Sequence, residues 1–178
     1  MSNSNNNIKI IEDAVKTYVN FPKQGIIYKD IFGIFQNVTA MKAMKELLVD
    51  HAASLNIDAI VGLDSRGFLL GPLISLELGK PFIPIRKKGK LPGNVMRESY
   101  TLEYGEATFE IQTDSITSGL KVLIVDDLLA TGGTIKAAVK LLKATGAQVV
   151  ECLVIMELVG LDGKSKIDAP VHSFIKYE

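Results

Sequence analysis

Residues 122–134 read Val-Leu-Ile-Val-Asp-Asp-Leu-Leu-Ala-Thr-Gly-Gly-Thr, and this stretch decides the fold. Its first four residues are apolar without interruption, which is typical of a strand buried on both faces of a parallel sheet. Directly after the stretch, four apolar residues at helical spacing predict a helix: Ile135, Ala138, Val139 and Leu142. A strand that leads through a short loop into a helix is the repeating unit of α/β folds.

The same alternation of strand and helix recurs along the chain. Short apolar runs predict strands over residues 59–63, 82–85, 121–125 and 149–156, and a helix is expected over 66–78. An earlier amphipathic helix is expected over 40–54. The chain of 178 residues is long enough for one hydrophobic core. We therefore predict a single α/β domain over 1–178, with a central, mostly parallel sheet flanked by helices.

Three other segments do not follow this alternation. Residues 1–7 are rich in Asn and Ser and are expected to form a disordered tail. Apolar residues at helical spacing predict a helix from Ile10 to Tyr18, and an extended segment follows over 26–35. Residues 86–104 are basic, then rich in Gly and Pro, then polar, and a strand is expected over 107–112. An irregular segment of this length in a small domain is typical of a lid or binding loop.

Composition excludes several classes of function. The 20 basic and 20 acidic residues cancel, so no global field attracts nucleic acid or an anionic membrane. No apolar stretch reaches the length of a membrane span, and the first residues contain no apolar signal core. The single cysteine, Cys152, lies in an apolar run and has no partner for an internal disulfide. We expect a reducing compartment, the cytoplasm, and partners that are neither nucleic acid nor membrane.

The chemistry is expected at the end of the strand over 122–125. Residues Ala130 to Thr134 form a loop of small residues that enters a helix, and such a loop offers backbone N–H groups and a helix dipole to an anion. The carboxylates of Asp126 and Asp127 can accept hydrogen bonds from vicinal hydroxyls or hold Mg²⁺ directly or through water. Together they favour a sugar phosphate. The alternative is a tight turn with solvated aspartates. Walker-type and dinucleotide-binding glycine motifs are absent from the sequence.

Residues 122–134 resemble the phosphoribosyl diphosphate signature of the type I phosphoribosyltransferases. The similarity is greatest to the adenine-specific branch of that family. It extends over nearly the whole chain, through Phe21-Pro22, residues 62–68, residues 86–93 and Leu102-Glu103-Tyr104-Gly105. The resemblance implies a parallel sheet flanked by helices, a small N-terminal hood over residues 8–35 and a mobile active-site loop over 86–104. It implies purine salvage, in which a transferase makes AMP and diphosphate from adenine and phosphoribosyl diphosphate.

The resemblance assigns the phosphoribosyl-binding residues. The 5′-phosphate is expected on Ala130, Thr131, Gly132, Gly133 and Thr134, and the ribose hydroxyls near Asp126 and Asp127. No direct protein ligand to a metal is expected; Mg²⁺ would be the cofactor, bound through substrate and water near the two aspartates. It offsets charge on the departing diphosphate.

The diphosphate needs a second anion site. Asp64, Ser65 and Arg66 follow a predicted strand and begin a helix, so backbone N–H groups and the Arg66 guanidinium can reach an anion there. By resemblance, the Asp64–Ser65 peptide is expected to be cis. The basic residues Arg86, Lys87 and Lys90 are expected to serve the same ligand, in their own site or in that of a second subunit, because the family is typically a homodimer. The alternatives are a surface role for Arg66 and a nucleic-acid patch for the basic run.

Base choice also follows from the resemblance. Hypoxanthine–guanine relatives carry an aspartate at the position of Ala130, and its absence here favours adenine. Glu103 is expected to be the catalytic residue that exchanges the N7 proton of the purine. Adenine is expected between Tyr28 and Leu128, with backbone groups near Ile27 and Lys29 as its polar partners. The family often has Phe and Arg where this chain has Tyr28 and Lys29.

Two alternative functions stay open at this point. One is a 6-oxopurine phosphoribosyltransferase acting on a base such as xanthine, which Ala130 and Glu103 disfavour. The other is a non-catalytic sensor of phosphoribosyl diphosphate. Such regulators usually carry a DNA-binding segment, and the sequence shows no helix-turn-helix with a basic recognition helix. A purely structural module would leave the aspartate pair and the Gly/Thr loop unexplained.

Overall fold

The computed structural model describes the backbone of residues 2–102 and 105–178, and the side chains of residues 3–99 and 107–178. The chain forms two compact units, Met1–His51 and Ala52–Glu178, and the predicted hood over 8–35 lies in the first of them. The first unit extends beyond residue 35 because its helices are joined to one another. The Asn7 side-chain amide in the first helix donates a hydrogen bond of 2.9 Å to the Glu46 carboxylate in the third.

The N-terminal unit consists of three helices and a two-stranded hairpin among its described residues. They are α1 (Ser2–Ala14), β1 (Lys16–Val19), β2 (Ile27–Asp30), α2 (Phe32–Phe35) and most of α3 (Val38–Ala53). The predicted extended segment over 26–35 is therefore a strand only as far as Asp30. The helix predicted over 40–54 is confirmed in α3.

Two predictions for this unit are wrong. Residues 2–7 are not a disordered tail but the first turns of α1, and Asn7 is buried there. The apolar residues that follow, at helical spacing, form the same helix, and this helix extends toward the N-terminus through the polar segment. The helix then ends at Ala14, and Tyr18 lies on β1 because residues 16–19 pair with β2 in antiparallel register, with Tyr18 opposite Tyr28. Thr, Tyr and Val favour strands, and the pairing overrides the helical spacing.

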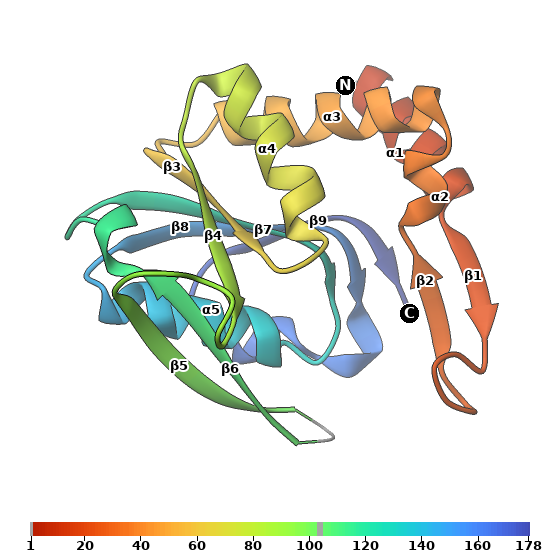
Figure 1. Ribbon diagram of the computed structural model, residues 1–178. Coiled ribbons are helices and arrows are strands. Elements are labelled where there is room, and N and C mark those ends of the chain that lie inside the picture. Colours follow the sequence, from red (N-terminus) through yellow and green to blue (C-terminus); the bar gives the residue numbers. More distant parts are fainter. Residues whose placement is uncertain (1, 103–104) are drawn as a thin grey trace. The chain divides into compact units, whose positions relative to one another are not determined.

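The Ala52–Glu178 unit contains, within its described residues, one sheet with strand order β5-β6-β4-β3-β7-β8-β9 (Figure 1). The strands are β3 (Ala59–Leu63), β4 (Phe82–Lys87), β5 (Val95–Leu102), β6 (Gly105–Gln112), β7 (Lys121–Leu129), β8 (Gln148–Leu158) and β9 (Val171–Tyr177). The neighbouring strands β4, β3, β7, β8 and β9 are parallel to one another. Strand β6 pairs antiparallel with both β4 and β5. The predicted mostly parallel α/β sheet is confirmed.

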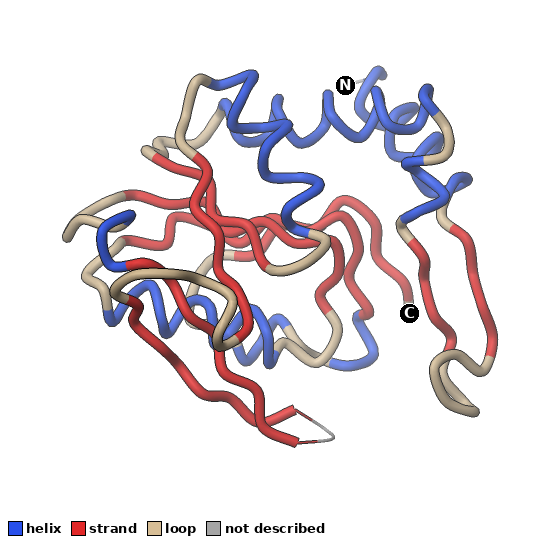
Figure 2. The backbone as a smooth tube through the Cα atoms, in the orientation of Figure 1, coloured by secondary structure: helices blue, strands red, loops and turns tan. Residues whose placement is uncertain are grey.

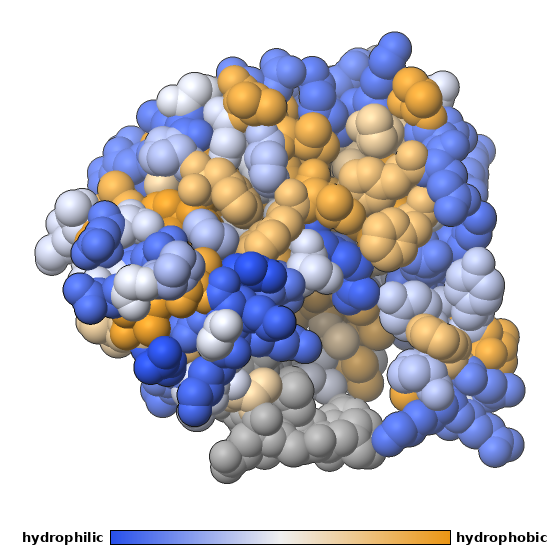
Figure 3. All heavy atoms as spheres, viewed as in Figure 1, coloured by the Kyte–Doolittle hydropathy of each residue, from blue (hydrophilic) through white to orange (hydrophobic). Residues whose placement is uncertain are grey.

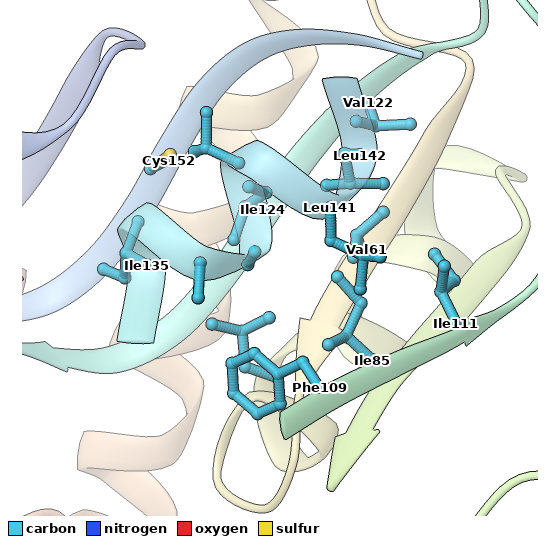
Figure 4. Close-up of a cluster of buried hydrophobic side chains, with 14 of the residues drawn as sticks. Val61, Ile85, Phe109, Ile111, Val122, Ile124, Ile135, Leu141, Leu142 and Cys152 are labelled. Carbon is cyan, nitrogen blue, oxygen red and sulfur yellow. The ribbon is translucent and has the colours of Figure 1, made fainter. Parts of the chain in front are cut away.

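Two helices of this unit cover opposite faces of the sheet (Figure 1). On one face, α4 (Gly67–Leu78) lies close to β3, where a Cβ added at Gly71 would contact Ile60. On the other face, α5 (Gly133–Ala144) buries Ile135, Leu141 and Leu142 against the strands. Figure 4 shows these side chains directed toward Val61, Ile85, Val122, Ile124 and Cys152. This core fixes the end of β7 and the start of α5 relative to each other.

The segment 86–104 is more regular than predicted. Arg86 and Lys87 belong to β4, and residues 95–102 form β5, which pairs along its length with β6 (Figure 2). Among the described residues of this segment, the irregular part is the turn over residues 88–94. The prediction of an irregular loop was wrong because β5 is an edge strand with several polar side chains. An edge strand paired on one side does not need the apolar pattern of a buried strand.

Candidate active site

The aspartate pair lies within a strand. β7 continues to Leu129, and its register with β8 pairs Asp126 with Val154 and Leu128 with Met156. The sequence predicted that the strand would end at Val125, because Asp is rare in strands. The length of β8, which runs to Leu158, allows the extra pairing. Both carboxylates are therefore fixed by sheet hydrogen bonds and not by a loop.

A cavity of about 380 Å³ opens beside the carboxyl end of β7. In an open α/β sheet, ligands bind at this edge. The cavity brings together twelve of the residues that the sequence predicted for the phosphoribosyl, diphosphate and base sites: Asp64, Ser65, Arg66, Lys87, Asp126, Asp127, Leu128, Ala130, Thr131, Gly132, Gly133 and Thr134. Its lining also includes Phe109, Leu129 and Ile135, which were not predicted as site residues.

The loop after β7 has the geometry of an anion cradle. Gly132 precedes the first turn of α5 with a φ of 83°, a left-handed conformation that glycine adopts at low cost. Its carbonyl accepts the first helical hydrogen bond, from Lys136 N–H at 2.9 Å. The N–H groups of the first turn of a helix have no partner within the helix. Because Gly133, Thr134 and Ile135 also line the cavity, a phosphate there can accept hydrogen bonds from this turn.

A second segment, which sequence reasoning missed, supports this loop from outside the cavity. It is the connection between β8 and β9, where Gly163 is buried against the loop. A Cβ on Gly163 would overlap the carbonyl oxygen of Ala130 and lie 2.8 Å from the backbone nitrogen of Gly132. Lys166 donates a hydrogen bond of 3.2 Å to the carbonyl of Thr131. The only sequence signal was a turn-forming Asp-Gly pair at 162–163, which does not reveal its partner.

The two aspartates have different environments. Asp127 is buried, with 3% of its surface exposed, and forms an ion pair of 2.5 Å with the Arg66 guanidinium. Asp126 accepts a hydrogen bond of 3.0 Å from the backbone N–H of Asp127. Burial raises the pKa of Asp127, although Arg66 opposes the rise. Burial and the neighbouring Asp127 charge raise the pKa of Asp126 well above its usual value. Ionising both carboxylates in the free protein therefore costs free energy, because they are buried and close to each other.

This cost gives a prediction for stability. Replacing Asp126 by asparagine should raise the melting temperature by a few degrees near neutral pH, because a neutral isostere no longer ionises in a buried site. A raised carboxyl pKa stabilises the folded state fully below the unfolded value of 3.8, and that stability is lost as the pH rises through the folded pKa. Thermal unfolding with a metal chelator, at several pH values, should show the difference between Asp126→Asn and wild type shrinking toward acid pH. A difference that is constant with pH would contradict this.

The predicted diphosphate end lies on the adjacent strands. The Asp64–Ser65 peptide after β3 is cis, as the resemblance implied. Arg86 on β4 donates a hydrogen bond of 2.9 Å from Nε to the Asp64 carboxylate, and its Nη1 contacts the Lys90 carbonyl at 3.3 Å. Arg86 is therefore connected to the cavity by its bond to Asp64, and Lys90 is connected by its bond to Arg86. Lys87 lines the cavity directly. The Lys90 side chain is exposed.

The remaining predicted residues lie elsewhere. Ile27, Tyr28 and Lys29 lie on β2 of the N-terminal unit. There, Tyr28 packs edge-on against Phe21, with ring centroids 5.1 Å apart, and Lys29 Nζ donates a hydrogen bond to Thr17. Glu103 lies outside the described residues.

Among the residues that the structure describes, no group of three or more His, Cys, Asp and Glu side chains is arranged to hold a metal ion. Within the same residues, no helix combines the length and apolar character that crossing a bilayer requires. Asp64, Asp126 and Asp127 are the acidic residues that line the cavity.

Two aspartates beside a glycine-rich anion cradle, at the carboxyl edge of a parallel sheet, define a protein that binds a phosphorylated sugar. The phosphoribosyl transferase domain model matches residues 33–177, and the chain belongs to this family. Within the family it belongs to the adenine phosphoribosyltransferases. The enzyme of that name from Drosophila pseudoobscura pseudoobscura is 51% identical over 169 residues, which cover 94% of this chain and 93% of that protein.

Solved structures give the same result. The adenine phosphoribosyltransferase of Saccharomyces cerevisiae, complexed with D-2,5-dideoxy-2,5-imino-altritol 1,6-bisphosphate and adenine, matches with a TM-score of 0.90 and 41% identity, over 96% of this chain and 99% of that one. The enzyme from Giardia lamblia, complexed with 9-deazaadenine, matches with a TM-score of 0.89 and 32% identity, over 96% and 98% of the two chains.

Proposed function

We propose that this chain makes AMP and diphosphate from adenine and phosphoribosyl diphosphate. The observation that supports the proposal most strongly is the cavity in which Asp126 and Asp127 lie beside the glycine-rich loop from Ala130 to Thr134. One part of the cavity can hold a phosphate monoester and the other can hold vicinal hydroxyls. A sugar phosphate needs both functions within the same small space.

The proposed mechanism is displacement at the anomeric carbon through an oxocarbenium-like transition state. The glycine-rich loop holds the 5′-phosphate, and the two aspartates hold the ribose hydroxyls, so the sugar is fixed at both ends. Arg66 and Lys87 are cations at the cavity, on the side where Asp64 and Ser65 lie, and we assign the diphosphate to that side. Binding energy that fixes the sugar in this way offsets part of the entropic barrier to the reaction.

Base choice rests on what the cavity does not supply. Ala130 lines it with a methyl group, so this position has no acid–base group for a 6-oxopurine ring. Leu128, which also lines the cavity, offers one apolar surface for a purine, and we propose Ile27, Tyr28 and Lys29 as the other adenine-binding residues. Reactions run in parallel with hypoxanthine, guanine and xanthine test this assignment. Product from any of these at the adenine rate would remove Ala130 as a determinant of specificity.

Glu103 is proposed as the group that exchanges the N7 proton of adenine. A general acid or base lowers the barrier of the chemical step and contributes little to ground-state binding. Glu103→Gln should therefore lower kcat more than it raises the KM for adenine. Steady-state kinetics at saturating phosphoribosyl diphosphate separates the two constants. A variant with normal kcat and a raised KM would make Glu103 a binding residue.

Mg²⁺ is the proposed cofactor, and the cavity fits it. Mg²⁺ usually keeps several of its waters, and Asp126 and Asp127 at the cavity can accept hydrogen bonds from those waters, while substrate oxygens would bind the ion directly. When bound, the ion would offset negative charge on the diphosphate. The same two carboxylates can orient its bound waters. Titration of activity against Mg²⁺ in the presence of a chelator tests this requirement.

A homodimer is proposed from the surface of α4. Leu76 is 83% exposed on this helix and Leu69 also reaches the surface, and Figure 3 shows apolar residues gathered over it. Large exposed apolar groups on a helix are typical of contact surfaces. A second copy of the chain would cover them. Sedimentation equilibrium should give twice the chain mass of 19.4 kDa, and a monomer at working concentration would contradict the proposal.

The cytoplasm is the proposed compartment. Cys152 is the single cysteine of the sequence, so the fold needs no internal disulfide. Burial raises the pKa of its thiol to about 12, which keeps it in the unreactive thiol form. Fractionation of cells that express the tagged chain tests the assignment.

A further inference from the structure

Glu110 is a buried carboxylate outside the cavity, and the proposed mechanism does not use it. It lies on β6 between Phe109 and Ile111, which both point into the core. Because side chains alternate along a strand, Glu110 points to the opposite face of the sheet. An acidic residue there would normally be solvated, yet its exposure is 0%. The turn over residues 88–94 covers it.

The carboxylate of Glu110 is bonded through both oxygens. Oε1 accepts hydrogen bonds of 2.8 Å from the backbone N–H groups of Lys90 and Leu91. Oε2 accepts one of 3.1 Å from Nε of Arg97 on the neighbouring strand β5. Burial alone would raise the pKa of Glu110, but these bonds lower it to about 2, so the group stays ionised. A buried charge is costly unless it is paired, and here each partner belongs to the turn or to β5.

The turn held by Glu110 is connected to the cavity through side chains. In the sheet register Glu110 lies opposite Arg86 on β4 and opposite Arg97 on β5. The Lys90 carbonyl, in the residue whose N–H binds Glu110, accepts a hydrogen bond of 3.3 Å from Arg86. Arg86 in turn binds the Asp64 carboxylate, which lines the cavity. A chain of direct contacts therefore runs from Glu110 to Asp64.

The same turn carries much of the local positive charge. Lys87 precedes it and lines the cavity, and Lys88 and Lys90 are exposed on it. This turn, with three nearby cations, is bonded to a buried anion. Neutral or apolar groups could fill the same volume at lower cost, so the charge specifies a conformation of the turn.

We propose that Glu110 is a positioning residue for the diphosphate of the substrate: its carboxylate fixes the turn over residues 88–91, and thereby Arg86 and Asp64, at the edge of the cavity. The proposal rests on the proposed function of the cavity. Glu110 does not touch the ligand, so its effect is expected on the binding of phosphoribosyl diphosphate and not on that of adenine.

The test is Glu110→Gln, which keeps the shape and removes the charge. The amide can accept only neutral hydrogen bonds from the turn and places an NH₂ group opposite Arg97. Charge-assisted bonds are about twice as strong as neutral ones, and we expect the KM for phosphoribosyl diphosphate to rise about tenfold. A tenfold rise in KM corresponds to about 1.4 kcal/mol. The KM for adenine should stay within about twofold of the wild-type value, because adenine loses no contact in the variant.

The matched control is Glu98→Gln, on the same hairpin. Glu98 forms an ion pair of 2.6 Å with Lys140 on α5, away from the turn, and its loss should leave both KM values unchanged. If Glu110→Gln does not fold, Glu110→Asp keeps the charge and shortens the side chain, and the same comparison applies. Equal KM values for phosphoribosyl diphosphate in the folded variant and wild type, or equal losses for both substrates, would overturn the inference.

Calorimetry of phosphoribosyl diphosphate binding without a base separates this inference from the proposed function. If wild type binds the ligand but makes no AMP, the proposed function fails and Glu110 is still tested by its affinity. If wild type is active and the variant binds the ligand as tightly as wild type does, only the role of Glu110 fails.

Discussion

Replacing Asp127 by asparagine should lower kcat/KM for phosphoribosyl diphosphate by about 10²- to 10³-fold, the usual loss when one preorganised electrostatic group is removed from a site. Asp127 is fixed on a strand, buried, and paired with Arg66. The asparagine amide keeps the shape of the side chain but does not offset the Arg66 charge. It also accepts weaker hydrogen bonds from the ribose hydroxyls than a carboxylate does. The variant should stay folded, because burial raises the pKa of Asp127 and a neutral side chain costs less to bury.

Asp168→Asn is the control for this variant. Asp168 lies in the same unit and forms an ion pair of 2.6 Å with Lys143, but its side chain is exposed. Its replacement removes one negative charge from the chain and leaves the cavity intact. Initial rates compare the activity of the two variants, and circular dichroism shows whether each of them is folded. Normal turnover in a folded Asp127→Asn protein would remove the aspartate pair from the site.

Gly163→Ala should lower kcat/KM for phosphoribosyl diphosphate by about 10²-fold, although the residue lies outside the glycine-rich motif. The new methyl group would overlap the carbonyl oxygen of Ala130, a backbone atom that cannot rotate aside. Either the phosphate loop or the connection between β8 and β9 must move. A displacement near 1 Å at a reacting site is enough to cost about 10²-fold in rate.

Gly160→Ala is the matched control, in the same connection. A Cβ at Gly160 would have its nearest neighbour at 4.0 Å, which is ordinary contact, so activity and stability should stay close to wild type. Kinetics with ribose 5-phosphate as a competitive inhibitor reports the phosphate loop directly. If Gly163→Ala folds and binds this inhibitor as tightly as wild type does, the connection does not support the loop.

The repeating pattern of the sheet could be predicted from the sequence. Uninterrupted apolar runs marked β3, β4, β7 and β8, because a strand buried on both faces needs apolar residues at every position. Helical spacing marked α5, and the helix expected over 66–78 corresponds to α4. The glycine-rich loop could also be located, since its function depends on backbone geometry that few residue types allow.

Features that depend on distant partners could not be predicted. The edge strand β5 has a polar sequence, and only its pairing with β6 makes it a strand. The β1–β2 pairing likewise ended α1 at Ala14. Gly163 and Glu110 have no distinctive sequence signal, because their importance comes from the backbone of segments distant in the sequence, at Ala130–Gly132 and Lys90–Leu91.

The most direct test of the proposed activity is the formation of AMP from adenine and phosphoribosyl diphosphate with Mg²⁺, with diphosphate release measured in the same reaction. This activity requires one diphosphate for each AMP, and its rate should fall sharply in Asp127→Asn. Tight binding of phosphoribosyl diphosphate without AMP formation would contradict it and would point to a sensor of this ligand.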